Sequence, residues 1–298
     1  MVRLSGTAYF QLIFSQFNGD FHNLVNRWII LMLIVAGVCF LVSEIARNYS
    51  QVDKLWSLLP IVYGWFTAAA VPTPRVILMA SLVTVWGMRL SYNFYRKGGY
   101  NIIPWKGEED YRWSIMRETN MLKGRFRFGI FNLLFISFYQ NIVIFMFSSP
   151  LLLAAIFPDK ELTAIDLLAG ILMLVFIITE SIADNQQFRF HAEKKNPGNS
   201  GNLYKKSVSK GFLSEGLWKY VRHPNFTSEQ AIWICFYLFG VAASGLWLNI
   251  TLAGPVLLIL IFIGSSRLTE NISSKKYPEY AAYQKEVPKF IPRLSGRK

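Results

Sequence analysis

A run of polar residues directly before an apolar segment carries the clearest chemical signal in the sequence. It reads GLWKYVRHPNF over residues 216–226, and Glu229 follows one helical turn after Asn225. Arg222 can make bidentate contacts to a phosphate, and His223 can donate or accept a proton near neutral pH. A helix that begins at about Asn225 would add free backbone N–H groups for an anion. The run therefore predicts a cofactor-binding turn, although a basic turn at a membrane interface would use the same residues.

A second polar cluster precedes this run on one face of an expected helix. Glu180, Asp184 and Gln187 follow the i, i+4, i+7 spacing that places side chains on one helical face, and Arg189 lies two residues further. Polar groups on that face could bind the hydroxyl and amide groups of a nucleotide, and the basic residues beyond it would meet the phosphates. The alternative is an amphipathic helix end whose polar groups are satisfied by water.

Candidates for contact with a lipid substrate lie in the first half of the chain. Asp53 and Tyr63 flank the start of one apolar segment, and Trp86, Arg89 and Tyr92 recur every third residue in the next. This spacing keeps one helical face nearly constant for about two turns, so that face could line a pocket. An aromatic belt at the membrane interface would give the same pattern.

Two common catalytic chemistries have no matching motif. His22, His191 and His223 are far apart and form no HExxH-type ligand pair, so the sequence predicts no metal site. No Gly-x-Ser-x-Gly elbow of a serine hydrolase is present. Cys39 and Cys235 lie in apolar runs, where a thiol behaves as a small hydrophobe, so neither a disulfide framework nor a cysteine metal site is expected.

The composition indicates which elements must position these residues. Of the 298 residues, 53% are hydrophobic and 16% charged, with a mean hydropathy of +0.30, whereas a typical soluble domain has about 25% charged residues. A soluble enzyme and a disordered chain are therefore excluded. Seven stretches approach the roughly 20 apolar residues that a membrane-spanning helix needs, at 28–46, 55–71, 75–94, 128–157, 164–183, 230–247 and 250–268.

These stretches predict an all-α membrane bundle of about seven helices that forms a single domain over 28–298. Residues 1–27 would form an N-terminal interfacial segment, and the cofactor half would lie at about 164–298. The long fourth stretch contains Pro150, so it is either kinked there or is a helix followed by a short re-entrant piece.

The distribution of charge predicts the orientation of the bundle. The net charge is +13, and 26 of the 31 lysines and arginines fall in four segments, at 46–54, 95–127, 184–229 and 267–298. With seven spans all four segments lie on one side, which the positive-inside rule makes cytoplasmic. We therefore expect the N-terminus outside, the C-terminus inside and an active site facing the cytoplasm. The basic excess thus reflects topology, and no nucleic-acid partner is expected.

Four charged residues lie within the predicted spans. Glu44 and Asp166 are near span ends, where an ordinary interfacial position is the expectation. Arg89 and Glu180 lie one or two turns from the cytoplasmic face, where an ionisable group is either a functional residue or an interfacial anchor.

The motifs, taken together and in order, resemble the steroid 5-alpha-reductase superfamily, in particular its branch of uncharacterised membrane proteins. The resemblance covers about residues 50–293 and rests on VDKLWSLLPIVYGW, WGMRLSYNFYRKGGY, EDYRW, ADNQQFRF, NPGN, GLWKYVRHPNFTSEQ and YPEYAAYQKEVPKFIP. It implies a seven-span fold, a cytosol-facing NADPH site built from the last spans and their loops, and reduction of an activated carbon–carbon double bond in a lipid.

The resemblance also implies roles for individual residues. Asp184 matches the acidic residue that contacts the cofactor after the fifth span. Gln187, on the same helical face, and Arg189, two residues further, are the other cofactor-binding candidates of this helix. The cofactor motif before the sixth span would comprise Tyr220, Arg222, His223, Asn225 and Glu229.

Some positions depart from the family pattern. Phe226 and Ser228 stand where the family usually has tyrosine and glycine. The pair that holds the substrate ketone in the steroid enzymes aligns with Asp53 or Lys54 and with Trp86, which puts a 3-oxo-steroid substrate in doubt.

The leading hypothesis is an NADPH-dependent membrane reductase of a sterol-like or isoprenoid-like lipid. A group that polarises the substrate carbonyl would come from Asp53, Tyr63, Arg89 or Tyr92. A second hypothesis is an S-adenosylmethionine-dependent methyltransferase of the isoprenylcysteine or phospholipid type, which shares the Arg-His-Pro motif. A third is a non-catalytic membrane protein that keeps the fold. The expected partners are a lipid substrate and membrane lipids, in the endoplasmic reticulum of a eukaryote or the inner membrane of a bacterium.

Overall fold

All regular secondary structure in the described part of the chain is helical. The computed structural model describes residues 19–101, 103, 105–196 and 203–293, which form helices, turns and loops with no strand. The elements in chain order are α2 (Gly19–Ala46), α3 (Gln51–Leu55), α4 (Leu59–Ala70), α5 (Pro74–Arg96), α6 (Tyr111–Glu118), α7 (Arg125–Phe131), η1 (Asn132–Tyr139), α8 (Gln140–Ser148), α9 (Pro150–Ile156), α10 (Ala164–Lys195), α11 (Lys205–Lys210), η2 (Gly216–Lys219), α12 (Pro224–Ser244), η3 (Ile250–Leu252), α13 (Ala253–Lys276) and α14 (Tyr280–Glu286). The predicted all-α class is confirmed for these residues.

Five helices are long and apolar enough to cross a membrane. They are His22–Ala46, Arg125–Ser148, Ala164–Lys195, Pro224–Ser244 and Ile250–Lys276. These coincide with five of the seven predicted spans and indicate an integral membrane protein.

The other two predicted spans, 55–71 and 75–94, correspond to α4 and α5. Helix α4 has 12 residues, or about 18 Å at 1.5 Å per residue, which is less than the roughly 30 Å hydrocarbon layer. A turn at 56–58, with Pro60 in the first turn of α4, separates it from α3. The count of seven and the orientation remain predictions.

The start of the first span differs from expectation. Of the predicted interfacial segment 1–27, residues 1–18 lie outside the described residues. Residues 19–27 belong to α2, which begins at Gly19.

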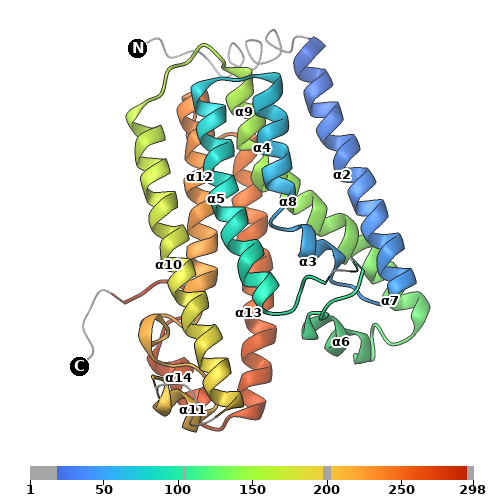
Figure 1. Ribbon diagram of the computed structural model, residues 1–298, viewed down its shortest axis with the longest axis vertical. Helices are drawn as coiled ribbons and strands as arrows, with labels where there is room; N and C mark the ends of the chain where they lie inside the picture. The colour runs from blue at the N-terminus through green and yellow to red at the C-terminus, as the bar shows by residue number, and fades with distance from the viewer. Residues whose placement is uncertain (1–18, 102, 104, 197–202, 294–298) are drawn as a thin grey trace. The chain divides into compact units, whose positions relative to one another are not determined.

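The chain divides into two compact units. Unit 1 contains Met1–Ala169 and Phe236–Gly254, and unit 2 contains Gly170–Cys235 and Pro255–Lys298. Helices α10, α12 and α13 therefore each contribute to both units (Figure 1).

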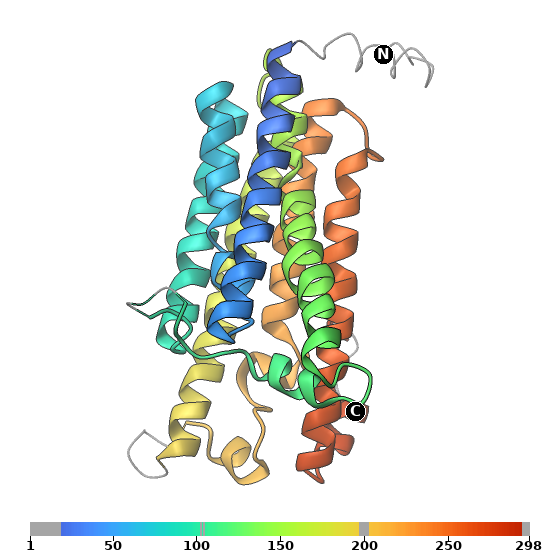
Figure 2. The same ribbon diagram turned by 90° about the vertical axis from the view of Figure 1, so that its right-hand side faces the viewer.

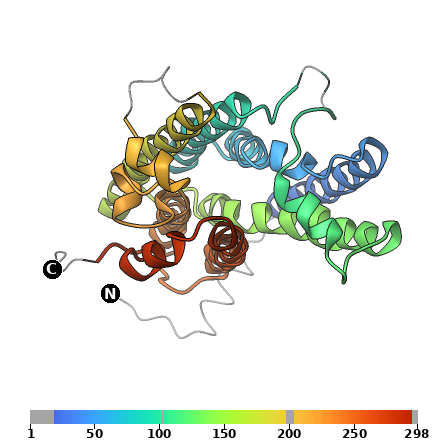
Figure 3. The same ribbon diagram turned by 90° about the horizontal axis from the view of Figure 1, so that it is seen from below.

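Aromatic stacking joins three helices of unit 1. Trp28 of α2 stacks on Tyr63 of α4, with ring centroids 4.1 Å apart, and Phe145 of α8 meets the edge of Trp28 at 5.7 Å. Trp28 and Tyr63 are almost fully buried. Figures 2 and 3 show α2 running beside the segment formed by η1 and α8.

Small residues allow α5 to pack closely against α4 and against the turn before α4. A Cβ atom on Gly64 would lie 3.2 Å from the Cα of Ala80, and one on Gly87 would lie 2.5 Å from the carbonyl oxygen of Ser57. Glycine at these positions therefore permits backbone contact that a side chain would prevent, as is common between membrane helices.

A buried ion pair ties the start of α5 to the start of α10 in unit 1. The Arg75 guanidinium donates to both carboxylate oxygens of Asp166, over 2.8 and 2.9 Å, and both side chains are at most 2% exposed. Thr163 also donates to Asp166, and Arg75 donates to the carbonyls of Lys160 and Glu161. The expectation of an interfacial Asp166 is therefore wrong, because a partner 91 residues away lets the carboxylate be buried.

The fourth apolar stretch is divided in a way that the sequence only partly predicts. A break at Ser149 and Pro150 separates α8 from the short α9, as the proline indicated. Ahead of it, η1 is an eight-residue π-helix, a rare conformation often found at functional sites. Asn132 at its start donates to Glu44 over 2.9 Å, so Glu44 is held by a neighbouring helix.

Two loops that the charge distribution places on one side of the membrane are in contact in unit 1. Asn48 donates to the carbonyl of Gly107, and the backbone N–H of Tyr49 donates to Glu109. Trp113 of α6 donates to Asp53 of α3 over 3.0 Å. These contacts agree with the prediction that segments 46–54 and 95–127 share one face.

Unit 2 has a long helix and a folded region at one end. Helix α10 has 32 residues, about 48 Å, which is longer than the roughly 30 Å hydrocarbon layer. The short helices α11 and α14 lie at the end of unit 2 where α10 and α13 terminate (Figures 1 and 3). An aromatic cluster packs there, with Phe212, Tyr280, Tyr283 and Val287 at its centre.

Candidate functional site

All eight predicted cofactor-binding residues lie in unit 2. Asp184, Gln187 and Arg189 are on α10, and Tyr220, Arg222 and His223 lie in the turn before α12. Asn225 and Glu229 belong to the first turns of α12. Residues that are up to 45 positions apart in the sequence thus belong to one compact unit.

The turn at Arg222 and His223 is organised around one carboxylate. Glu270 of α13 accepts a hydrogen bond from Arg222 Nε at its Oε1 atom over 2.7 Å, and the same oxygen lies 2.9 Å from His223 Nε2. Gln284 and Lys289 also approach it, at 3.2 and 3.3 Å. Glu270 is 5% exposed, so a buried anion holds together three segments of unit 2.

The segment after α14 completes this arrangement through its backbone. The N–H groups of Arg222 and His223 donate to the carbonyls of Pro288 and Lys289, over 2.9 and 3.2 Å. The Arg222 guanidinium also donates to the carbonyls of Gln284 and Val287. Most donors of Arg222 are therefore engaged within the protein, and this geometry favours a positioning role for Arg222 over direct phosphate contact.

A buried acidic cluster lies beside this turn. Asp184 is 3% exposed and Glu229 is 4% exposed. Asn225 Nδ2 lies 3.4 Å from Asp184 Oδ1, and Glu229 accepts a hydrogen bond from Trp233 over 3.0 Å. The Asn225–Asp184 contact brings the start of α12 next to the polar face of α10.

The remaining cofactor candidates are more accessible. Arg189 is exposed, Gln187 is half-buried, and Tyr220 is 56% exposed with Lys219 over its ring. Gln186, which the sequence did not single out, accepts a hydrogen bond from the backbone of Leu217 and fixes the loop before the turn.

The two departures from the family pattern have local roles. The Phe226 ring stacks on His223, with centroids 5.3 Å apart, and packs on Phe262. Ser228 is buried, and its hydroxyl donates to the carbonyl of Pro224 one turn earlier. The hydroxyl at the glycine position is therefore satisfied within α12.

All four predicted catalytic residues lie in unit 1, and no hydrogen bond, ion pair or ring contact described for this unit joins two of them. Tyr63 is 1% exposed in the aromatic core, Arg89 is half-buried on α5, and Tyr92 is 63% exposed with Arg96 over its ring. The predicted shared face of α5 is therefore split, since Trp86 is fully buried while Tyr92 faces outward.

Asp53 has the most distinctive environment of the four. It lies on α3, accepts the Trp113 hydrogen bond, and has Arg112 and Asp110 nearby. Burial raises the pKa of Asp53, and the Arg112 charge opposes this only in part. A carboxyl group with a raised pKa can remain protonated and donate a hydrogen bond. The adjacent Lys54 donates a hydrogen bond from Nζ to the carbonyl of Lys106 over 2.9 Å.

Asp53→Asn is expected to stabilise the protein as the pH rises. Because the folded-state pKa of Asp53 is raised, its contribution to stability is present at low pH and is lost as pH rises through that pKa. Asparagine keeps an acceptor for Trp113 and cannot ionise, so the melting temperature should exceed that of wild type by about 2–4 °C near neutral pH. Thermal melts in detergent between about pH 4 and 7 measure the difference.

The matched control is Asp110→Asn. The Arg112 hydrogen bonds lower the pKa of Asp110 overall, although burial alone would raise it. Its stabilisation is present above the unfolded pKa and lost as the pH falls, so Asp110→Asn should lower the melting temperature. Equal responses of the two variants would contradict the assignment.

The regions of similarity to known proteins include both the cofactor-binding and the catalytic candidates. A family described as a protein of unknown function (DUF1295) matches residues 39–287. An uncharacterised protein of Schizosaccharomyces pombe is 36% identical over 293 residues, an alignment that covers 93% of this chain and 83% of that protein. No solved structure matches the chain. The family match includes every residue predicted for the site.

Proposed function

Since the chain belongs to the DUF1295 family, whose function is not known, we propose that it is an NADPH-dependent membrane reductase. Its substrate would be a sterol-like or isoprenoid-like lipid with an activated carbon–carbon double bond. The proposal rests on the motifs that resemble the steroid 5-alpha-reductase superfamily and on the polar cluster of unit 2. The site would face the cytoplasm, in the endoplasmic reticulum of a eukaryote or the inner membrane of a bacterium.

One observation carries the cofactor assignment. Asn225 Oδ1 is buried and has no hydrogen-bond partner among the described residues, although its amide nitrogen points to Asp184. A buried acceptor without a donor costs about 1–3 kcal/mol, so a ligand that donates there is favoured. The amide and ribose hydroxyl groups of NADPH are donors of this kind.

The surrounding residues supply complementary chemistry. Asp184 and Glu229 could accept hydrogen bonds from hydroxyl or amide groups, and Arg189, which is exposed, would meet phosphate charge. Arg222 and His223 would hold the turn through Glu270. When bound, NADPH supplies a hydride to the β-carbon of the substrate.

Asp53 is the preferred residue for carbonyl polarisation. A protonated Asp53 can donate a hydrogen bond to the carbonyl oxygen, and the α-carbon then takes a proton from water or an acid. Tyr63, Arg89 and Tyr92 are the other candidates, but Tyr92 is mostly exposed and Tyr63 belongs to the aromatic core.

The cofactor assignment is tested by ligand-dependent stabilisation. NADPH at about 100 times its Kd should stabilise the wild-type protein by about 2.7 kcal/mol, seen as a higher melting temperature in detergent. Asn225→Ala should weaken NADPH binding about tenfold, because its buried acceptor is lost. Gln230→Ala, which changes another polar residue of α12, is the control and should bind NADPH as wild type does. If NADPH neither stabilises the protein nor is oxidised with polyprenyl or sterol enones, the proposal fails.

The methyltransferase alternative has one specific observation in its favour. Glu270 near the end of the last span contacts the Arg-His-Pro turn directly. Membrane methyltransferases that share this turn usually have an acidic pair shortly after the last span, and Glu270 supplies one acid of such a pair. The same melting experiment with S-adenosylmethionine distinguishes the two, since only the true cofactor should stabilise. Stabilisation by neither cofactor would favour the non-catalytic reading.

A further inference from the structure

A basic pocket in unit 1 is lined by none of the predicted cofactor-binding or catalytic residues. It has a volume of about 220 Å³ and is lined by Arg47, Tyr49, Arg117, Gly124, Arg125 and Phe128. Arg47 directly follows the first span, and Arg125 begins the span Arg125–Ser148. The pocket therefore lies where two spans end on the same side of the unit.

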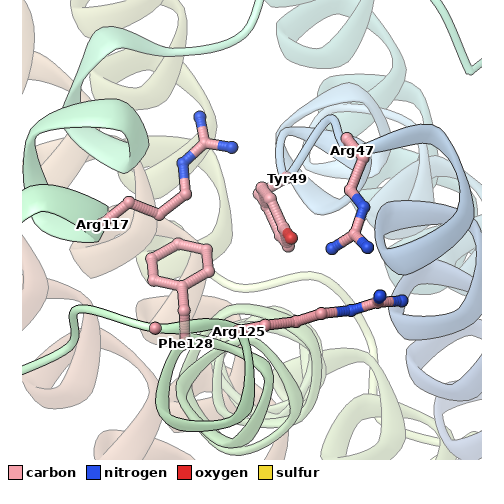
Figure 4. Close-up of a pocket in the computed structure, with 6 residues that line it drawn as sticks. Arg47, Tyr49, Arg117, Arg125 and Phe128 are labelled. Atoms are coloured by element: carbon pink, nitrogen blue, oxygen red, sulfur yellow. The ribbon is translucent and has the colours of Figure 1, made fainter.

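The charges in the pocket are incompletely balanced. Arg117 pairs with Glu109, and Arg47 lies 3.7 Å from Glu44. Among the residues that the structure describes, no ion-pair partner is found for Arg125. Figure 4 shows the guanidinium groups of Arg47 and Arg125 extending to the same side of the pocket. One positive charge is left over, which is the complement of a single phosphodiester.

The backbone at Arg47 adds a second observation. Its φ is 56°, in the left-handed region where glycine or asparagine is usual and other side chains are strained. Such strain often marks a position where the side chain has a function. Here the strained residue closes α2 and delivers its guanidinium to the pocket.

An apolar groove adjoins the basic pocket. It has a volume of about 460 Å³, and Arg125 lines both cavities. Its other lining residues come from α2 and from the α7–η1 segment, and they are Phe40, Glu44, Phe126, Gly129, Ile130 and Leu133. Phe126 and Ile130 are exposed large apolar residues on a segment that begins a membrane span. The groove is suited to an acyl chain that extends from a lipid headgroup bound at Arg125.

We propose that the basic pocket and the adjoining groove form a binding site for an anionic phospholipid. The phosphate is held by Arg47 and Arg125, with Arg117 fixed behind them by Glu109 and by the rings of Tyr49 and Phe128, 5.1 and 5.7 Å from its guanidinium. One acyl chain lies in the groove between α2 and the α7–η1 segment. Juxtamembrane arginines attract anionic lipids, and the apolar groove selects a lipid over a soluble phosphate.

The test compares lipids and variants on the full-length protein purified in detergent. The probes are dioleoylphosphatidylglycerol, dioleoylphosphatidylcholine and glycerol 3-phosphate, read by native mass spectrometry and by melting temperature. Phosphatidylglycerol should bind at least tenfold more tightly than phosphatidylcholine, and glycerol 3-phosphate should not stabilise. The double variant Arg47→Gln/Arg125→Gln should reduce phosphatidylglycerol binding at least tenfold.

The matched control removes the same charge from the same region. Lys123 and Arg127 are exposed and do not line the pocket, so Lys123→Gln/Arg127→Gln should bind phosphatidylglycerol within about twofold of wild type. Equal loss in both double variants, or equal affinity for the two lipids, would overturn the proposal. Equal stabilisation by glycerol 3-phosphate would replace the lipid with a soluble phosphate ester.

A groove-filling variant tests the acyl chain separately. A Cβ atom on Gly129 would have only the Glu44 carboxylate within 4 Å, at 3.9 Å. Because Gly129 lines the groove, we expect the Gly129→Leu side chain to occupy it. Because leucine is also a better helix former than glycine, the lipid-free protein should melt at or above the wild-type temperature. Phosphatidylglycerol binding should fall at least tenfold, and undiminished binding would exclude the groove.

Discussion

Replacing Glu270 with glutamine is expected to abolish NADPH-dependent activity and to destabilise the protein by about 3–5 kcal/mol, as measured for other buried ion pairs that lose one partner. Glu270 is 5% exposed, and the Arg222 side chain that it binds is 10% exposed. Glutamine keeps the shape and leaves Arg222 and Lys289 without their carboxylate. The turn that positions Asn225 should then lose its orientation.

Two measurements separate the effects of this substitution. Melting in detergent reports stability, and NADPH titration at a temperature where the variant remains folded reports the site. We expect about a tenfold loss of NADPH affinity, similar to that of Asn225→Ala, because the substitution acts through the turn that positions Asn225. Glu279→Gln is the matched control, since Glu279 is 63% exposed and pairs with Lys210 over 3.6 Å; its effect should be within 0.5 kcal/mol.

The outcomes discriminate between roles for Glu270. A stability loss with unchanged NADPH affinity would make Glu270 purely structural. Retention of both properties would contradict the description of Glu270 as the centre of the turn. If S-adenosylmethionine rather than NADPH loses affinity, the turn serves the methyltransferase alternative.

The sequence predicted the local parts of this site better than its long-range contacts. The helical spacing of Glu180, Asp184 and Gln187 and the proline that begins α12 depend on neighbouring residues alone, and the structure has both features. Glu270 is 48 residues from Arg222. Glu270 lies just beyond the last predicted span, which ends at 268, and it looks like any charge near a span end, so nothing local distinguishes it as the partner of the turn.

The same limit explains what was missed in unit 1. The five longest apolar helices were predictable because hydrophobic length is a local property. The π-helix η1 and the strained Arg47 were not, since both depend on packing between segments that are distant in sequence. Asp166 near a span end was expected at the interface, and only the position of Arg75 makes its burial possible.

Asp166→Asn is accordingly expected to be among the most destabilising single substitutions in unit 1. Arg75 would remain buried with its charge uncompensated, at a cost of about 3–5 kcal/mol. The midpoint of unfolding in mixed detergent micelles measures this loss. Asp159→Asn, an exposed carboxylate in the preceding loop, is the control and should change stability by less than about 0.5 kcal/mol.

The double variant Arg75→Met/Asp166→Leu shows whether the ion pair stabilises the protein, or whether each charge only offsets the cost of burying the other. Replacing both charges with apolar groups of similar volume removes the uncompensated cation, so it should be more stable than Asp166→Asn alone. Recovery should be incomplete, because Arg75 also donates to the carbonyls of Lys160 and Glu161, which would lose their partners. A double variant as unstable as the single one would mean that those backbone contacts, rather than the ion pair, hold the start of α5 to the loop before α10.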